Sequence, residues 1–217
     1  MIIPVRYWEP SPNRLSYTED GKCRADWYRM GLMNCLLEFK PKVCVEIGTR
    51  TGHTAKVFYE YFKKHCRDGT LITCDIGQFC SLQSPGVKQV KVYPHSMEAV
   101  DVDRTLPQDT LLPDWREKVG QSVNENTNMI LKAMAGQLAD FIYIDGDHTR
   151  NGVAKDWEIA KYVCRQEFVA VFNDVQSCRN DCTKWYQEEI VGKYDSTRFA
   201  EWPVYCGMGC CKVEGGK

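Results

Sequence analysis

The chain has 217 residues, 28 basic and 29 acidic side chains, and a formal net charge of −1 at neutral pH. This length suffices for one α/β domain with a sizeable core, and the balanced charge argues against a broad face for nucleic acid. The sequence contains no apolar run of about 18 residues, and its first ten residues lack the core of a signal peptide. We therefore expect a soluble, cytoplasmic protein without membrane contact.

Apolar periodicity divides the chain into alternating helices and strands. Residues 1–22 are polar and contain Pro4, Pro10 and Pro12, so we predict an irregular arm there and a single domain over residues 23–217. The predicted helices cover residues 23–39, 54–66, 129–138, 153–164 and 181–192. The predicted strands cover residues 43–47, 70–75, 87–93, 141–144, 168–172, 198–200 and 207–213.

A long polar stretch, residues 101–128, interrupts this alternation. We interpret it as an insertion near the mouth of a ligand crevice, since loops of this length are often lids or specificity elements. A surface excursion without function is the alternative. The helix that follows is predicted to bury Ile130, Met134 and Leu138.

The twelve cysteines are many for one domain. Three lie within apolar strand or helix patterns, where a thiol behaves as a small hydrophobic group. These three are Cys44, Cys74 and Cys164. A second group has a spacing unlike that of a zinc knuckle, so reduced thiols are expected there, with zinc binding as the alternative. This group comprises Cys178, Cys182, Cys206, Cys210 and Cys211.

A glycine-bearing turn follows the first predicted strand. The stretch Val43–Thr54 is typical of a buried strand that ends in a turn, Gly48 to Gly52, and opens a helix. Glycines let the backbone approach a ligand closely, and the N–H groups of a helix N-terminus face the same crevice. Glu46 would repel a pyrophosphate but suits a cation. S-adenosylmethionine carries an ammonium and a sulfonium group, so we interpret the turn as a site for this methyl donor. An ordinary strand-to-helix turn is the alternative.

The next two predicted strands end in residues suited to a nucleoside. Asp75 ends the second strand, where an acid accepts hydrogen bonds from both ribose hydroxyls of a bound nucleoside. A solvated strand-end aspartate is the alternative. Ser96 and Met97 follow the third strand, and we expect them at the edge and face of an adenine ring.

Polar side chains also follow two later strands. Asp145, Asp147 and His148 come directly after one apolar strand, and Asn173 and Asp174 come after the next. The carboxyl ends of parallel strands share one edge of the sheet, where open sheets bind ligands. Oxygen ligands suit Mg²⁺ first, and then Mn²⁺ or Ca²⁺. A histidine beside acids suits a general base next to a Lewis acid. Capping acids without a metal are the alternative.

Together, these motifs resemble those of the class I S-adenosylmethionine-dependent methyltransferases. The similarity covers about residues 25–214. Within this class, the motifs most resemble those of the branch that contains cephalosporin-hydroxylase-like proteins and macrolide-sugar and rhamnosyl O-methyltransferases. The motifs that carry it are Glu46-x-Gly48-x-x-x-Gly52, Asp75, Ile144-Asp-Gly-Asp-His148 and Asn173-Asp174. Neither residues 101–128 nor the first twenty residues have a counterpart in the family.

The resemblance implies a Rossmann-like α/β fold. Its sheet would be seven-stranded and mostly parallel, with an antiparallel last strand and helices on both faces. The implied cofactor-binding residues are Glu46, Gly48, Thr49, Gly52, Thr54, Asp75, Ile76, Ser96, Met97 and Asp145. The implied metal ligands are Asp145, Asn173 and Asp174. Catechol-type relatives have Asp and then Asn at the later tip, and sugar-type relatives have two acids. Here Asn173 leaves two carboxylates and one amide.

We therefore expect methyl transfer to a hydroxyl of a sugar, as in the deoxysugar of a glycan or glycoside, assisted by Mg²⁺ or Mn²⁺. His148 is the expected base, with Asp145 and Asp147 as the other catalytic residues. A metal-independent enzyme, with His148 or Asp147 acting alone, and a catechol-type enzyme are alternatives. A module that binds a nucleotide or NAD without catalysis is a further one. The expected partner is a small-molecule or glycan acceptor, and no binding of nucleic acid is expected. A homodimer is a possible assembly.

Overall fold

The structure is a computed structural model that describes residues 22–50, 52–76, 86–91, 122–176, 181–199 and 207–214. The strands are β1 (Val43–Ile47), β2 (Thr70–Asp75), β3 (Val87–Lys91), β4 (Ala139–Ile144), β5 (Cys164–Asn173), β6 (Asp195–Phe199) and β7 (Met208–Val213). The helices are α1 (Lys22–Phe39), α2 (His53–His65), α5 (Ser122–Met134), α6 (Arg150–Val163) and α7 (Cys182–Glu189).

The strands of these ranges form one seven-stranded sheet with the order β3-β2-β1-β4-β5-β7-β6. β7 pairs antiparallel with β5 and β6, whereas the other neighbours are parallel. This confirms the predicted Rossmann-like sheet with its antiparallel last strand. The strand order reverses between β1 and β4, and such a switch point is where open sheets bind ligands at the strand carboxyl ends.

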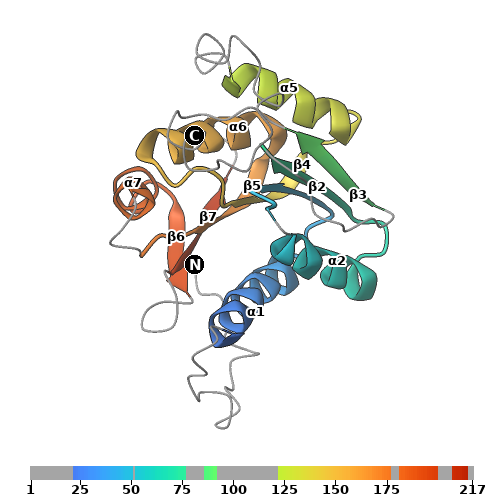
Figure 1. The fold of residues 1–217 in the computed structure, drawn as a ribbon, viewed down its shortest axis with the longest axis horizontal. Helices are drawn as coiled ribbons and strands as arrows, with labels where there is room; N and C mark the ends of the chain where they lie inside the picture. Colours follow the sequence, from blue (N-terminus) through green and yellow to red (C-terminus); the bar gives the residue numbers. More distant parts are fainter. Residues whose placement is uncertain are drawn as a thin grey trace.

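Helices cover both faces of the sheet. α1 and α2 lie on one face and α5, α6 and α7 on the other (Figure 1). On each face, the helices and the sheet enclose a separate cluster of buried hydrophobic residues. All five residues of β1 are buried, as expected for a parallel strand covered on both sides. The continuous apolar runs in the sequence are therefore explained by strands that helices cover on both faces of the sheet. None of the helices in the described ranges is long and apolar enough to cross a bilayer.

The helix before β4 begins earlier and ends earlier than predicted. α5 starts at Ser122, inside the predicted insertion of residues 101–128, and it ends at Met134. Its first turns are polar, so the apolar pattern alone placed the start too late. It stops because Ala135 and Gly136 both have positive φ values, 54° and 83°. Leu138, predicted on the inner row, lies beyond the helix and is 40% exposed.

Cys164 belongs to a strand, although the periodicity placed it at the end of a helix. Its backbone is extended, with φ −95° and ψ 161°, and it pairs with Ala139 of β4. β5 is therefore longer than the five predicted residues, and a register shift between Ala139 and Phe141 accommodates the extra length.

Smaller differences concern the later elements. α7 ends at Glu189, because the chain turns at Gly192, whose φ is 83°. β6 begins at Asp195, three residues before the predicted strand. The predicted arm, residues 1–22, lies outside the described residues except for Lys22, and so do residues 101–121 of the predicted insertion.

Replacing Phe172 with Ala is expected to destabilise the fold strongly. The ring is 1% exposed and lies 5.4 to 5.8 Å from the rings of Trp157, Trp185 and Tyr186. Loss of a buried aromatic ring costs about 3–5 kcal/mol, because a cavity remains. Urea unfolding measures this change. Tyr162→Ala, at a site that is 62% exposed, serves as control and should cost less than about 0.5 kcal/mol.

Candidate active site

The turn after β1 lies between the ends of β2 and β4. The Gly48 N–H donates to the Cys74 carbonyl at 2.8 Å, and the Asp145 N–H donates to the Ile47 carbonyl at 2.9 Å. These bonds extend the parallel pairing past the last strand residues. The predicted cofactor turn and the predicted acidic tip therefore meet at one edge of the sheet.

Gly48 is required by its close packing on the loop that follows β4. Its φ is +92°, and a Cβ built on it would lie 1.9 Å from the backbone carbonyl oxygen of Asp145. The position that a Cβ would take is filled by the loop after β4, and the predicted approach of this backbone to a ligand stays a prediction. Gly52, with φ 78°, fits the expectation better, because it caps the N-terminus of α2 in the left-handed region.

Glu46 is a buried carboxylate within β1. It is fully buried, and neither of its oxygens has a hydrogen-bond partner in the described part of the chain. Burial, followed by the charge of Asp145, raises its pKa well above the ordinary value. The nearby polar groups of the Thr49 side chain and the Ala55 backbone make no hydrogen bond of good geometry to it and offset only part of this rise. A buried carboxyl group without a partner is costly, and a cationic group on a ligand would supply one.

The remaining predicted cofactor residues surround the same turn. Thr49 is buried and its hydroxyl donates to the Cys74 carbonyl at 3.2 Å, and Thr54 is buried in the first turn of α2. The Arg50 N–H donates to Asp75 Oδ2 at 2.5 Å, so the turn and the tip of β2 are tied together. Ile76 packs against the core. Two further predicted residues, Ser96 and Met97, lie outside the described residues.

Four of the predicted catalytic and metal residues converge on one another. Asp145 Oδ1 accepts a hydrogen bond from Asn173 Nδ2 at 2.7 Å and lies 3.2 Å from His148 Nε2. The other imidazole nitrogen, His148 Nδ1, lies 3.1 Å from Asp174 Oδ2. The His148 side chain is 42% exposed, so a substrate can reach it.

The surroundings of His148 favour its cationic form. The hydrogen bond to Asp145 raises its pKa above 6.5, burial acts in the opposite direction, and the charges of Asp145, Asp174 and Asp147 add to the rise. Since both ring nitrogens face carboxylates, the imidazolium donates to both at once. Its deprotonation, which a general base requires, therefore occurs at a higher pH than for a free imidazole.

Asp147 supports the residue that caps α6, which is Thr149. Its Oδ1 accepts from the Thr149 N–H at 2.9 Å, and Thr149 Oγ1 in turn accepts from the Gly152 N–H at 3.0 Å. A Cβ on Gly152 would lie 2.2 Å from the Asp147 carboxyl carbon. The side chain thus packs on the first turn of α6 with Oδ1 bonded to the Thr149 N–H, and its predicted catalytic role stays a prediction.

Two residues of α7, Cys182 and Thr183, contact this group, although the sequence analysis gave neither a role at this edge of the sheet. Cys182 Sγ lies 3.5 Å from the His148 carbonyl oxygen, and Thr183 Oγ1 lies 3.3 Å from the Asp174 carbonyl oxygen. Burial is the main cause that raises the pKa of Cys182 to about 12, so this thiol stays protonated. The sequence marked Cys182 only as one of a group of cysteines and did not mark Thr183, since both lie in the first turn of an ordinary amphipathic helix.

The donors present suit a methyl-donor cofactor and a hard cation. Glu46 offers a buried carboxylate to an ammonium group, and the tips of β4 and β5 offer the oxygens of Asp145, Asn173 and Asp174. Within the described ranges, no three His, Cys, Asp or Glu side chains are grouped as a metal site, so any cation here would depend on the Asn173 amide. The eight cysteines whose side chains are described are free thiols, and Cys178 and Cys206 of the zinc alternative lie outside the described residues.

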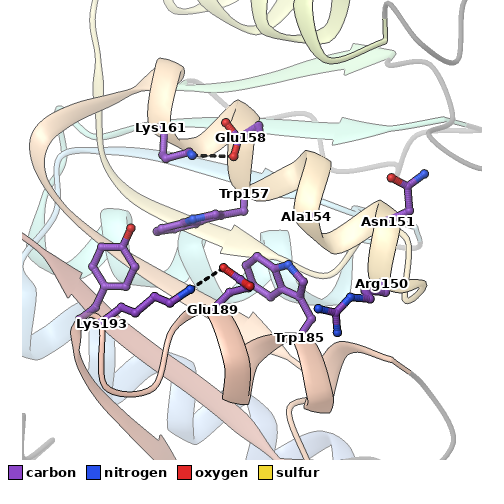
Figure 2. Close-up of a pocket in the computed structure, with 10 residues that line it drawn as sticks. Arg150, Asn151, Ala154, Trp157, Glu158, Lys161, Trp185, Glu189 and Lys193 are labelled. Atoms are coloured by element: carbon purple, nitrogen blue, oxygen red, sulfur yellow. Dashed lines mark hydrogen bonds and ion pairs between the residues drawn. The ribbon is translucent and has the colours of Figure 1, made fainter.

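A cavity of about 650 Å³ lies away from this edge, between α6 and α7. Figure 2 shows Trp157 and Trp185 in it, with the pairs Lys161–Glu158 and Lys193–Glu189 at its rim. None of its lining residues is a predicted site residue.

The fold and this edge define a Rossmann-like methyltransferase. A family described as "Methyltransferase domain" matches residues 45–175, from β1 to the loop after β5. The match spans more than half of the chain, and the chain belongs to this family. No curated protein matches the sequence.

The solved structures to which this chain is similar are distant in sequence. The MycE methyltransferase from the mycinamycin biosynthetic pathway, in complex with Mg, SAH and mycinamycin VI, is 11% identical with a TM-score of 0.53. This match covers 86% of the present chain and 49% of the MycE chain. In the match to another crystal form of MycE, the present chain covers 28% of the MycE chain. An O-methyltransferase from Bacillus cereus in complex with SAH is 14% identical, with a TM-score of 0.49 and coverages of 86% and 80%. A putative O-methyltransferase from Klebsiella pneumoniae is 14% identical, with a TM-score of 0.49 and coverages of 97% and 94%.

Glu46→Gln is expected to stabilise the ligand-free protein increasingly as pH rises. An acid whose pKa is raised on folding binds its proton more tightly in the folded state, so the stability of the wild type falls as pH rises above about 4.5, the ordinary value. The Gln variant lacks this loss. Urea unfolding at pH 5 and pH 8 measures both proteins.

The gap between variant and wild type should therefore be larger at pH 8 than at pH 5. The matched control is Glu167→Gln, which changes an exposed glutamate in β5 and should leave the two pH profiles parallel. Parallel profiles for Glu46→Gln as well would show that Glu46 is not held protonated.

Proposed function

We propose that this protein is an S-adenosylmethionine-dependent O-methyltransferase that uses Mg²⁺ and methylates a hydroxyl of a sugar, such as a deoxysugar of a glycan or glycoside. The observation that carries the proposal is the contact between the two halves of the site. The Gly48 turn packs directly on the backbone of Asp145, so a donor held by the turn lies beside the acidic tips. Family membership supports methyl transfer as the reaction.

The donor half of the site would bind three parts of the cofactor. Glu46, buried and without a hydrogen-bond partner in the described residues, would hold the ammonium group. Asp75, positioned by the Arg50 N–H, would accept the ribose hydroxyls, because an acid at this strand end faces the crevice. Ser96 and Met97 are proposed to contact the adenine.

The acceptor half would lie over the tips of β4 and β5. Asp145, Asn173 and Asp174 would hold Mg²⁺, which would favour the ionised form of an acceptor hydroxyl. His148 would remove the proton, since its ring is exposed enough to meet the acceptor and is oriented by two carboxylates. Rigid placement of the acceptor oxygen toward the methyl group would supply much of the rate.

The choice of a sugar rests on the resemblance and on the donor set. A pair of neighbouring hydroxyls suits an oxygen-rich edge, and a catechol would chelate in the same way. A catechol-type enzyme and a metal-independent enzyme, in which His148 or Asp147 acts alone, are the alternatives. We also propose a cytoplasmic location for the protein.

Asp75→Ala is expected to weaken binding of S-adenosylhomocysteine by roughly 10- to 100-fold, the range for loss of hydrogen bonds to a charged acceptor. Isothermal titration calorimetry measures the affinity. Asp68→Ala, at an exposed acid after α2, is the matched control and should bind like the wild type. Equal affinity in Asp75→Ala would remove the ribose role, and a preference of the wild type for NAD⁺ would end the methyl-donor proposal.

Asn173→Asp is expected to raise the affinity for Mn²⁺ about tenfold, since ligand charge tunes cation sites on this scale. The same change should destabilise the metal-free protein, because it replaces the 2.7 Å hydrogen bond to Asp145 with two facing carboxylates. Electron paramagnetic resonance measures free Mn²⁺, and thermal unfolding in EDTA measures stability.

The control for this variant is Asn128→Asp, at an exposed position in the middle of α5, which should alter neither quantity. Unchanged Mn²⁺ affinity in Asn173→Asp would exclude Asn173 from the metal ligands. Full turnover of a sugar acceptor after EDTA treatment would favour the metal-independent alternative.

A further inference from the structure

The first turn of α7 contacts both loops that carry the reacting side chains. Thr183 Oγ1 lies 3.3 Å from the backbone carbonyl oxygen of Asp174. Its neighbour Cys182 has its Sγ 3.5 Å from the backbone carbonyl oxygen of His148. Two consecutive residues of one helix thus donate to the loop after β5 and to the loop after β4.

The loop after β5 needs such support. Asp174 has a φ of +56°, a left-handed conformation that costs energy in a non-glycine residue and persists where the surroundings hold it. Without the Thr183 hydroxyl, the backbone of Asp174 would more easily relax toward ordinary φ values. Its carboxylate would then leave His148 Nδ1, which lies 3.1 Å away.

α7 is itself firmly anchored in the core. Trp185 and Tyr186 are 4% and 1% exposed, and the Tyr186 hydroxyl lies 3.2 Å from the carbonyl oxygens of Thr197 and Cys210. The Arg150–Glu188 ion pair, at 2.5 Å, joins α7 to the start of α6. The turn that carries Cys182 and Thr183 is therefore fixed relative to the sheet.

We propose that Cys182 and Thr183 are positioning residues, which hold the loops of β4 and β5 so that His148 and Asp174 keep their mutual geometry. Their importance for turnover rests on the proposed function, whereas their effect on geometry does not. Neither residue touches a reacting atom in this assignment. Small displacements matter here, because misplacement of a catalytic group by about 1 Å can cost about 100-fold in rate.

The test compares Thr183→Val, which keeps the shape and removes the hydroxyl, with Thr183→Ser, which keeps the hydroxyl. The first readout is the set of imidazole ¹H–¹³C cross-peaks of the metal-free protein at one fixed pH. The chain has four histidines, and His148→Gln assigns the relevant peak. The second readout is Mn²⁺ affinity. Thr197→Val is the matched control, because Thr197 also donates to a backbone carbonyl, that of Arg198 in β6.

Thr183→Val should move the His148 peak and leave those of His53 and His65 in place. It should also weaken Mn²⁺ binding about two- to tenfold, the range for one neutral hydrogen bond. Thr183→Ser and Thr197→Val should resemble the wild type. Cys182→Ala should move the His148 peak as well. If Thr183→Val does not fold, Thr183→Ala carries the same comparison.

Two results would overturn the proposal. An unmoved His148 peak in Thr183→Val would show that the hydroxyl does not position the loop. A peak moved equally in Thr183→Ser and Thr183→Val would show that the hydroxyl is not the cause. A wild type that binds no Mn²⁺ would count against the metal role under the proposed function, and the cross-peaks would still decide the positioning role.

Discussion

The close approach of Gly48 to the backbone of Asp145 is the constraint on which this site depends. A Cβ at Gly48 would lie 1.9 Å from that carbonyl oxygen, so only glycine lets the loops after β1 and β4 meet. Their contact brings Glu46 near enough to Asp145 for the charge of one to raise the pKa of the other. Donor-binding and acceptor-binding groups from distant parts of the chain thereby share one crevice.

Much of the fold could be predicted because parallel strands buried on both faces leave continuous apolar runs in the sequence. β1 and β2 were predicted with the bounds they have. The start of α5 could not be predicted, because its first turns are polar and lack apolar residues at helical spacing. Cys164 was misplaced because a small apolar residue fits a helix and a strand equally well.

The site, too, could be predicted in part. Strand order brings Asp145, His148, Asn173 and Asp174 to one edge, and the sequence shows each of them at the end of a strand. The orientation of a side chain is decided by local hydrogen bonds, as for Asp147, which accepts from the N–H of Thr149. Contacts made across the fold, such as that of Thr183 with Asp174, leave no periodic signal. The sequence therefore predicted the residues at the strand ends, but not the side chains whose hydrogen bonds hold them in place.

The position of β7 has a consequence for the assembly of the sheet. β7 follows β6 in the sequence but lies between β5 and β6, pairing with both. β6 can therefore join the sheet only through β7, and β5 presents an unpaired edge until β7 docks. Such an edge is a template for intermolecular pairing. Chains released before Met208 would thus be expected to associate through β5, and docking of β7 protects the protein from aggregation.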